Sequence, residues 1–205
     1  MSRRAASANR GGFRAFNMHR LHQIVFVVCL AALSWLAMMA VHELGHVLGA
    51  LLTGGSVERV VLHPLTISRT DVSPNPHPAI VVWLGPIVGC LLPLMLSTVV
   101  PRRFVVARNI GRCFAGFCLI ANGAYISVGS FDRVGDCGEM LRTGTPLWGM
   151  LVFGAVTIVW GMSLWHSLGS VKQFLGDSSL VTPRMTYWLC GVLCLTIVVQ
   201  CVLSS

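Results

Sequence analysis

Five long apolar runs divide the sequence, and they constrain the fold more than any other feature. About 20 apolar residues is the length that an α-helix needs to cross the hydrocarbon core of a bilayer, which is about 30 Å thick. Hydrophobic residues make up 55% of the chain and charged residues only 11%, which excludes an ordinary soluble domain. We therefore expect an all-α polytopic membrane protein with about five transmembrane helices. The expected spans are residues 21–52, 79–100, 113–130, 147–168 and 187–203.

Residues 1–20 differ from the rest, because arginines stand there among Ser, Ala, Gly and Asn without apolar periodicity. We expect a disordered basic tail, followed by a single membrane-embedded domain over residues 21–205. A secretory signal peptide is disfavoured, since the first apolar run continues into a polar motif without a small-residue cleavage site. Most of the 15 Lys and Arg residues fall in this tail and in connections on the same side of the expected spans. The positive-inside rule therefore predicts a cytoplasmic N-terminus.

The first apolar run ends in an H-E-x-x-H motif formed by His42, Glu43 and His46. Residues four apart lie on the same face of a helix, so both imidazoles can bind one metal ion. Glu43, beside the first histidine, would then act as the base for a water on that metal. This arrangement is typical of zinc metalloproteases. The structural alternative is two core histidines and a glutamate that face an aqueous crevice.

A catalytic zinc needs three protein ligands and one open position, so a third ligand must come from elsewhere in the chain. Only seven residues are acidic, and Asp132, Asp136 and Glu139 follow the third expected span, on the same side as the H-E-x-x-H motif. We favour Asp136, because Gly135 and Gly138 would let the backbone approach a metal closely. Asp132 is the alternative ligand, and an ordinary solvated loop is the structural alternative. The expected cofactor is one Zn²⁺ per chain, although manganese or iron would accept the same ligand types.

The segment between the first two spans breaks the apolar pattern. Glycines end the first helix, and β-branched residues then alternate with polar ones, most regularly in residues 65–68. We expect a short β-like hairpin over residues 57–70. Pro64 cannot donate to a ladder, so a strand there would be an edge strand, available to hold an unwound substrate segment by strand addition.

Two G-x-x-x-G pairs stand in the first two spans, Gly45 with Gly49 and Gly85 with Gly89. Such pairs let helix backbones approach closely in lipid, so we expect these two helices to touch beside the metal. The alternative is that glycine is simply frequent in membrane helices.

With these features in this order, the chain resembles the site-2 protease family of intramembrane zinc metalloproteases, which cut substrate helices within or near the bilayer. The resemblance covers roughly residues 36–142, and its specific element is the H-E-x-x-H motif. The family's later N-x-x-P and L-D-G patterns are not matched at these positions, because Asn122 has no proline three residues later and Asp136 is preceded by Gly135.

The resemblance implies a role for each matching residue. His42 and His46 would be metal ligands, and Glu43 would be the general base and then the general acid. An aspartate from a later span would be the third ligand, and we assign this role to Asp136. Asn122 would contact the substrate or the developing oxyanion, with a buried asparagine that bonds a helix neighbour as the structural alternative.

Two functions of different classes compete for this sequence. We expect an intramembrane zinc metalloendopeptidase that cleaves a membrane-protein substrate within or near the bilayer. The alternative is a non-catalytic metal-binding membrane protein that acts through partner binding. A metal transporter is disfavoured, because no row of acids and histidines crosses several spans. The expected partners are membrane lipid and a transmembrane protein substrate, with no nucleic acid, and the oligomeric state is unknown.

Overall fold

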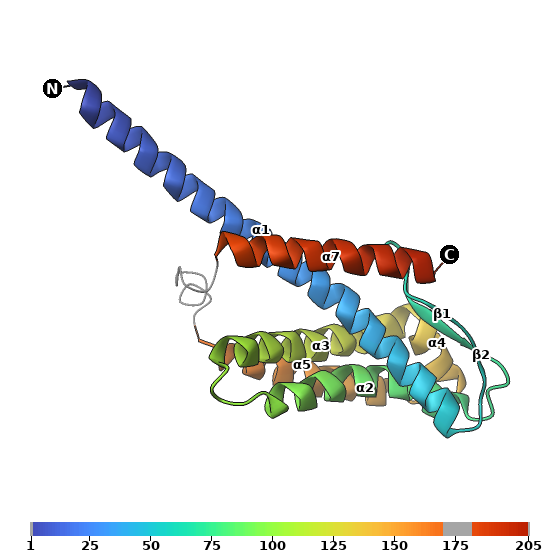
Figure 1. Cartoon of the computed structure of the whole chain (residues 1–205). Helices are drawn as coiled ribbons and strands as arrows, with labels where there is room; N and C mark the ends of the chain where they lie inside the picture. Colours follow the sequence, from blue (N-terminus) through green and yellow to red (C-terminus); the bar gives the residue numbers. More distant parts are fainter. Residues whose placement is uncertain (1, 170–181, 205) are drawn as a thin grey trace. The chain divides into compact units, whose positions relative to one another are not determined.

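The computed structural model describes residues 2–169 and 182–204, and it consists of helices with one small hairpin (Figure 1). Within this described part, five helices are long and apolar enough to cross a membrane, which confirms the expected fold class. These candidate spans are Arg20–Leu52, Pro78–Val99, Ala107–Asp132, Leu147–His166 and Pro183–Val202. The elements are α1 (Ser2–Leu52), β1 (Val57–Val61), β2 (Arg69–Val72), α2 (Pro78–Val99), α3 (Val105–Asp132), α4 (Gly135–Arg142), α5 (Leu147–His166) and α7 (Pro183–Leu203).

The largest differences from the expected helix boundaries are at the starts of α1 and α3. α1 begins at Ser2, so residues expected to form a separate tail are turns of this helix, and the division at residue 20 stays a prediction. α3 begins at Val105, several residues before the apolar run. Arginine is a good helix former whose long side chain can reach polar surroundings, so the helix continues past the apolar residues. Arg112, in this added turn, donates from Nη2 to Oγ of Ser167 at 2.7 Å.

The described residues fall into two compact units, one of residues 2–33 with 182–196 and the other of residues 34–169 with 197–204. In the first unit, α1 pairs with α7. The rings of His22 and Tyr187 meet edge-on with centroids 5.7 Å apart, and the Sγ atoms of Cys29 and Cys190 lie 3.3 Å apart. The second unit contains all the site residues.

Within the second unit, α3 packs between α2 and α5, and Figure 1 shows these helices side by side. A Cβ atom at Gly154 of α5 would lie 2.7 Å from the carbonyl oxygen of Gly123 on α3. A Cβ atom at Gly161 would lie equally close, 2.7 Å, to the carbonyl oxygen of Gly116. Only glycine permits this spacing, and such close packing drives helix association in lipid.

The C-terminal part of α1 packs as closely on α2. A Cβ atom at Gly45 would lie 2.7 Å from the Cα atom of Gly85, and one at Gly49 would lie 2.9 Å from the Cα atom of Val81. The helix contact predicted from the G-x-x-x-G pairs is therefore confirmed, and it lies one turn from the histidines.

The connection after α3 contains a short helix, α4, which positions Asp136. Arg133 ends α3 in the left-handed region with φ of 56°, and Gly135 follows with φ of 59°. This sharp turn directs α4 back against the ends of the long helices. A buried cluster from α2, α3, α4 and α5 then fixes it in place, made of Val82, Ile126, Cys137, Met140 and Met150.

The hairpin after α1 is confirmed, but its strands are shorter than the sequence pattern suggests. β1 and β2 pair antiparallel, and the alternating residues 65–68 lie in the connection between them. Leu65 and Ile67 are 88% and 82% exposed, so no sheet covers them. The alternation in residues 65–68 therefore does not mark a strand, and β1 ends at Val61, before the proline that lacks an N–H donor.

Candidate metal centre

His42 and His46 stand one turn apart on α1, as the H-E-x-x-H spacing predicts. Each of them is 6% exposed, and Glu43 between them is 2% exposed. Ionisable groups buried in a membrane protein are costly unless they are paired. What these three side chains contact therefore decides which chemistry the site supports.

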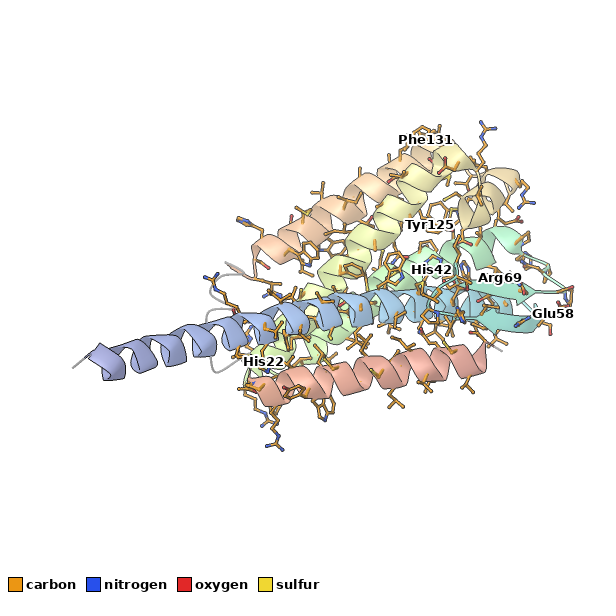
Figure 2. All side chains as sticks on the ribbon, turned by 90° about the horizontal axis from the view of Figure 1, so that it is seen from above. His22, His42, Glu58, Arg69, Tyr125 and Phe131 are labelled. Carbon is orange, nitrogen blue, oxygen red and sulfur yellow. The ribbon has the colours of Figure 1, made fainter. Side chains whose placement is uncertain are left out.

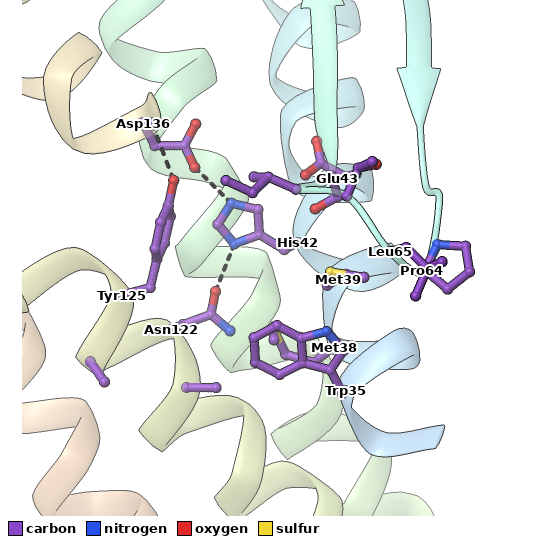
Figure 3. Close-up of a pocket in the computed structure, with 15 residues that line it drawn as sticks. Trp35, Met38, Met39, His42, Glu43, Pro64, Leu65, Asn122, Tyr125 and Asp136 are labelled. Carbon is purple, nitrogen blue, oxygen red and sulfur yellow. Dashed lines mark hydrogen bonds and ion pairs between the residues drawn. The ribbon is translucent and has the colours of Figure 1, made fainter. Parts of the chain in front are cut away.

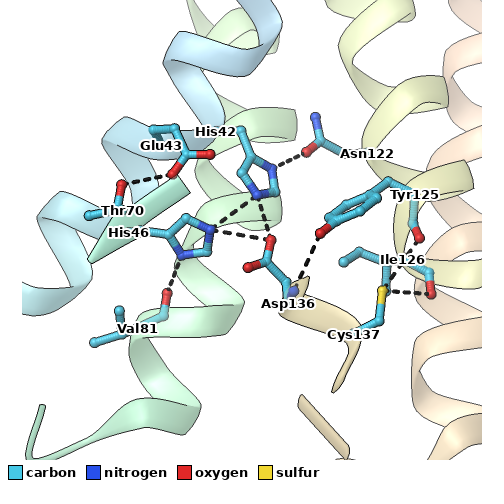
Figure 4. Close-up of polar contacts among 10 residues, drawn as sticks. All are labelled: His42, Glu43, His46, Thr70, Val81, Asn122, Tyr125, Ile126, Asp136 and Cys137. Carbon is cyan, nitrogen blue, oxygen red and sulfur yellow. Dashed lines mark hydrogen bonds and ion pairs between the residues drawn. The ribbon is translucent and has the colours of Figure 1, made fainter. Parts of the chain in front are cut away.

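Asp136, in the first turn of α4, reaches both histidines (Figure 4). Its Oδ2 atom lies 2.8 Å from Nε2 of His42 and 3.3 Å from Nε2 of His46. The two Nε2 atoms are 3.1 Å apart. Across the part of the chain that the structure describes, these are the residues whose ligand atoms gather in the manner of a metal site, all within 4.8 Å of one another.

The outer nitrogen of each imidazole is already used. Nδ1 of His42 donates to Oδ1 of Asn122 at 2.7 Å, and Nδ1 of His46 donates to the carbonyl oxygen of Val81 at 2.9 Å. Because those oxygens only accept, Nδ1 of each ring carries a proton, so in the neutral imidazole, which is the form that binds a metal, Nε2 carries a lone pair. The carboxylate of Asp136 is an acceptor too. With both imidazoles neutral, three acceptor atoms meet without a donor among them, an arrangement that fits a divalent cation held by imidazole and carboxylate ligands.

The electrostatic surroundings keep Asp136 in the form that a metal ligand needs. Burial disfavours its charged form, but when no metal is bound, hydrogen bonds and positive charge from the protonated imidazoles of His42 and His46 outweigh burial and hold the pKa of Asp136 well below its ordinary value. Burial raises the pKa of Cys137 to about 11, so this neighbouring thiol is neutral at neutral pH. At neutral pH, Asp136 is therefore anionic, whereas Cys137 is a neutral thiol and offers no thiolate ligand.

The other two acids after α3 do not join the histidines. Asp132 is exposed at the end of α3. Glu139 pairs with Arg142, with Oε2 and Nη2 2.8 Å apart. Of the candidates that the sequence left open, the structure brings Asp136 to His42 and His46.

Two glycines of α2 make room for the site. A Cβ atom at Gly85 would lie 2.9 Å from Nδ1 of His46 and closer still to other atoms of that ring. A Cβ atom at Gly89 would lie 2.8 Å from Oδ1 of Asn122. The second G-x-x-x-G pair therefore shapes the site as well as the helix packing.

Asn122 lies beside the metal centre, as the resemblance implied, and both of its polar atoms have partners. Its Oδ1 accepts from His42, and its Nδ2 donates to the carbonyl oxygen of Cys118 at 2.9 Å. With 1% of the residue exposed, Asn122 orients the His42 ring. Its contact with substrate stays a prediction.

Two further contacts of the site escaped the sequence analysis. The hydroxyl of Tyr125 accepts a hydrogen bond from the backbone N–H of Asp136 at 3.3 Å (Figure 4). The ring of Tyr125 meets that of His42 edge-on with centroids 5.8 Å apart, and Figure 2 shows the two residues close together. Oγ1 of Thr70 donates to Oε2 of Glu43 at 2.7 Å. The spacing of Tyr125 three residues after Asn122 puts both on one face of α3, a signal that could have identified the tyrosine. No sequence signal identifies Thr70.

Comparison with protein families bears on this site directly. The sequence model of the family described as peptidase M50B-like matches residues 19–125, slightly more than half of the chain. The chain belongs to the peptidase M50B-like family. This confirms the resemblance to site-2 proteases and makes the chain a membrane metalloprotease by class. No curated protein and no solved structure matches it significantly.

The matched part of this M50B-like chain includes the H-E-x-x-H motif, Asn122 and Tyr125, whereas Asp136 lies beyond it. For the third ligand, the support comes from the geometry and not from the family match.

A cavity of about 690 Å³ opens beside the candidate metal centre of this M50B-like protein (Figure 3). His42, Glu43, Asn122 and Asp136 line its polar end. Its other walls come from α1, α3 and the connection between the strands, and include Trp35, Met38, Met39, Leu65, Ile67, Ala121, Ala124 and Tyr125. The cavity therefore joins a largely apolar space to the side chains of His42 and Glu43.

Proposed function

We propose that this protein is an intramembrane zinc metalloendopeptidase that cleaves a membrane-protein substrate within or near the bilayer. The observation that carries the proposal is the meeting of three acceptor atoms from His42, His46 and Asp136 beside buried Glu43, at the end of a cavity. These three residues would hold one Zn²⁺ per chain. When bound, zinc acidifies water and polarises the scissile carbonyl.

Glu43 supplies the proton transfers of the proposed reaction. Its carboxylate takes a proton from the attacking water and later gives that proton to the nitrogen of the leaving amine. Asn122 and the carbonyl of Val81 keep the two imidazoles oriented, because each accepts the Nδ1 proton of its histidine. Asn122 also lines the cavity, so contact with substrate is part of the proposal.

Substrate reaches the site as an unwound segment. A helix hides its carbonyl groups in backbone hydrogen bonds, so a transmembrane substrate must unwind locally before its peptide bond can be attacked. The sheet has only β1 and β2 within the described residues, so each has one edge without a neighbouring strand, and the β1 edge would bind an extended segment by strand addition. Apolar side chains of that segment would occupy the cavity.

The proposed setting is a lipid bilayer, with the N-terminus in the cytoplasm and the metal centre nearer the opposite face. This orientation rests on the Lys and Arg distribution between the spans. No nucleic acid takes part, and residues 21–205 act as a single membrane-embedded domain.

The decisive experiment replaces the general base. In the purified protein, Glu43→Gln should abolish cleavage of a transmembrane substrate while one zinc per chain stays bound. Glu139→Gln is the matched control, because Glu139 forms only a surface ion pair with Arg142. His46→Ala should lose both zinc and cleavage. If a cellular phenotype survives Glu43→Gln and is lost in His46→Ala, the non-catalytic metal-binding alternative is correct.

A further inference from the structure

The hairpin contacts the side chain that we assign as general base. Thr70, in β2, donates its hydroxyl proton from Oγ1 to Oε2 of Glu43 across 2.7 Å (Figure 4). Glu43 is 2% exposed, so water does not readily replace this donor. Both residues belong to the same compact unit.

The register of β2 directs Thr70 to α1. Successive side chains of a strand point to opposite faces. Arg69 and Asp71, on either side of Thr70, pair with each other at 3.4 Å, and their side chains are 64% and 42% exposed. A register shift of one residue would turn a charged side chain to Glu43 in place of the hydroxyl.

We propose that Thr70 is a positioning residue for Glu43. This proposal rests on the proposed role of Glu43 as general base. A glutamate side chain rotates about three bonds, and a hydroxyl that holds Oε2 restricts that rotation and leaves Oε1 for the proton transfer. The hydroxyl group, and not the bulk of the threonine side chain, makes this contact.

The same contact connects the hairpin to the reaction. Any movement of β2 away from α1 separates Oγ1 of Thr70 from the carboxylate. Thr70 thus links the state of the hairpin to the orientation of the base.

Kinetics of three variants separate positioning from a structural role. Thr70→Val removes the hydroxyl at nearly constant volume, and should lower kcat about 10-fold to 100-fold with KM changed by less than about twofold. Thr70→Ser keeps a hydroxyl and should restore kcat to within about threefold of the wild type. Asp71→Asn, on the opposite face of the same strand, should leave both constants unchanged. Zinc content should stay at one ion per chain in all variants.

Two kinetic results would overturn the proposal. One is a Thr70→Val protein with wild-type kcat. The other is equal loss of activity in Thr70→Val and Thr70→Ser, because that would mean that the strand had been disturbed and not the hydroxyl removed.

Hydrogen exchange tests the contact without any cleavage. Glu43→Ala and Thr70→Val should each speed exchange of the β2 amides, and the double variant should exchange no faster than either single one. Additive effects would overturn the proposal whatever the activity. A different result would overturn the proposed function and leave the Thr70–Glu43 contact standing. In that result the variants show coupled exchange, but the wild-type protein binds zinc and cleaves no substrate.

Discussion

Asn122 and His42 are joined by a hydrogen bond of 2.7 Å, in which Nδ1 of the imidazole donates to Oδ1 of the amide. The two residues come from α3 and α1, and Gly89 of α2 gives Asn122 the space to reach the ring. This contact sets which nitrogen of His42 faces Asp136.

Substitution of Asn122 distinguishes orientation of His42 from contact with substrate. Asn122→Leu removes the acceptor, and should weaken zinc binding about 10-fold to 100-fold. Asn122→Asp keeps an acceptor for Nδ1 but loses the amide donor, so it should retain zinc. Full activity in Asn122→Asp would assign the residue to orientation alone. Loss of kcat with zinc retained would support the predicted contact with substrate or oxyanion.

The third ligand is tested by two aspartates that stand close together in the sequence. Asp136→Ala removes the carboxylate beside both histidines, so zinc affinity should fall by at least about 10-fold, with loss of cleavage. Asp132→Ala is the matched control, because Asp132 is exposed and outside the cluster. The measurement is the zinc content of each variant after dialysis, determined by metal analysis. Zinc loss in Asp132→Ala, with Asp136→Ala unaffected, would contradict the observed geometry.

The space beside His46 is tested by adding one methyl group. Gly85→Ala places a Cβ atom against the ring of His46, so zinc binding should weaken and the thermal unfolding temperature should fall by several degrees, as expected for about 1–3 kcal/mol of overpacking. Gly191→Ala is the control, since a Cβ atom there meets nothing within 4 Å. Alanine favours a helix more than glycine does, by about 1 kcal/mol. A Gly85→Ala protein as stable as Gly191→Ala would show that α2 can move away from the ring.

Strand addition at the hairpin predicts sensitivity to proline in β1. Val61→Pro removes a backbone donor at the end of β1, so cleavage of a transmembrane substrate should fall while the zinc content is unchanged. Ile67→Pro lies in the connection between the strands and removes no ladder donor. Comparison of cleavage rates for the two variants is the measurement, and unchanged cleavage in Val61→Pro would reject a role for this edge.

The pairing of α1 with α7 predicts a specific cross-link. The Sγ atoms of Cys29 and Cys190 are 3.3 Å apart, close enough that a movement of about 1 Å brings them to the length of a disulfide bond. Mild oxidation should therefore yield a linked peptide that contains both residues, detected by mass spectrometry. Cys29→Ser should abolish it, whereas Cys113→Ser should not. A dominant cross-link through other cysteines would contradict this pairing.

The sequence predicted the long helices and the H-E-x-x-H pair because both depend on local chemistry. A run of apolar residues has to satisfy its own backbone hydrogen bonds in lipid, and helical spacing alone puts His42 and His46 on one face. The G-x-x-x-G pairs predicted the contact of α1 with α2 for a similar reason, since small residues at that spacing form a flat helix face.

Which carboxylate meets the two histidines, and which residues support the site, were decided only by the tertiary structure. The sequence favoured Asp136 over Asp132 only through its neighbouring glycines, whereas a left-handed turn at Arg133 and the packing of α4 determine which carboxylate reaches the histidines. Thr70 and Tyr125 carry no motif, and they meet Glu43 and Asp136 only because β2 and α3 fold against their neighbours. Helix periodicity acts over a few residues, whereas these contacts join segments that are distant along the chain. Packing in three dimensions, which no local pattern encodes, brings them together.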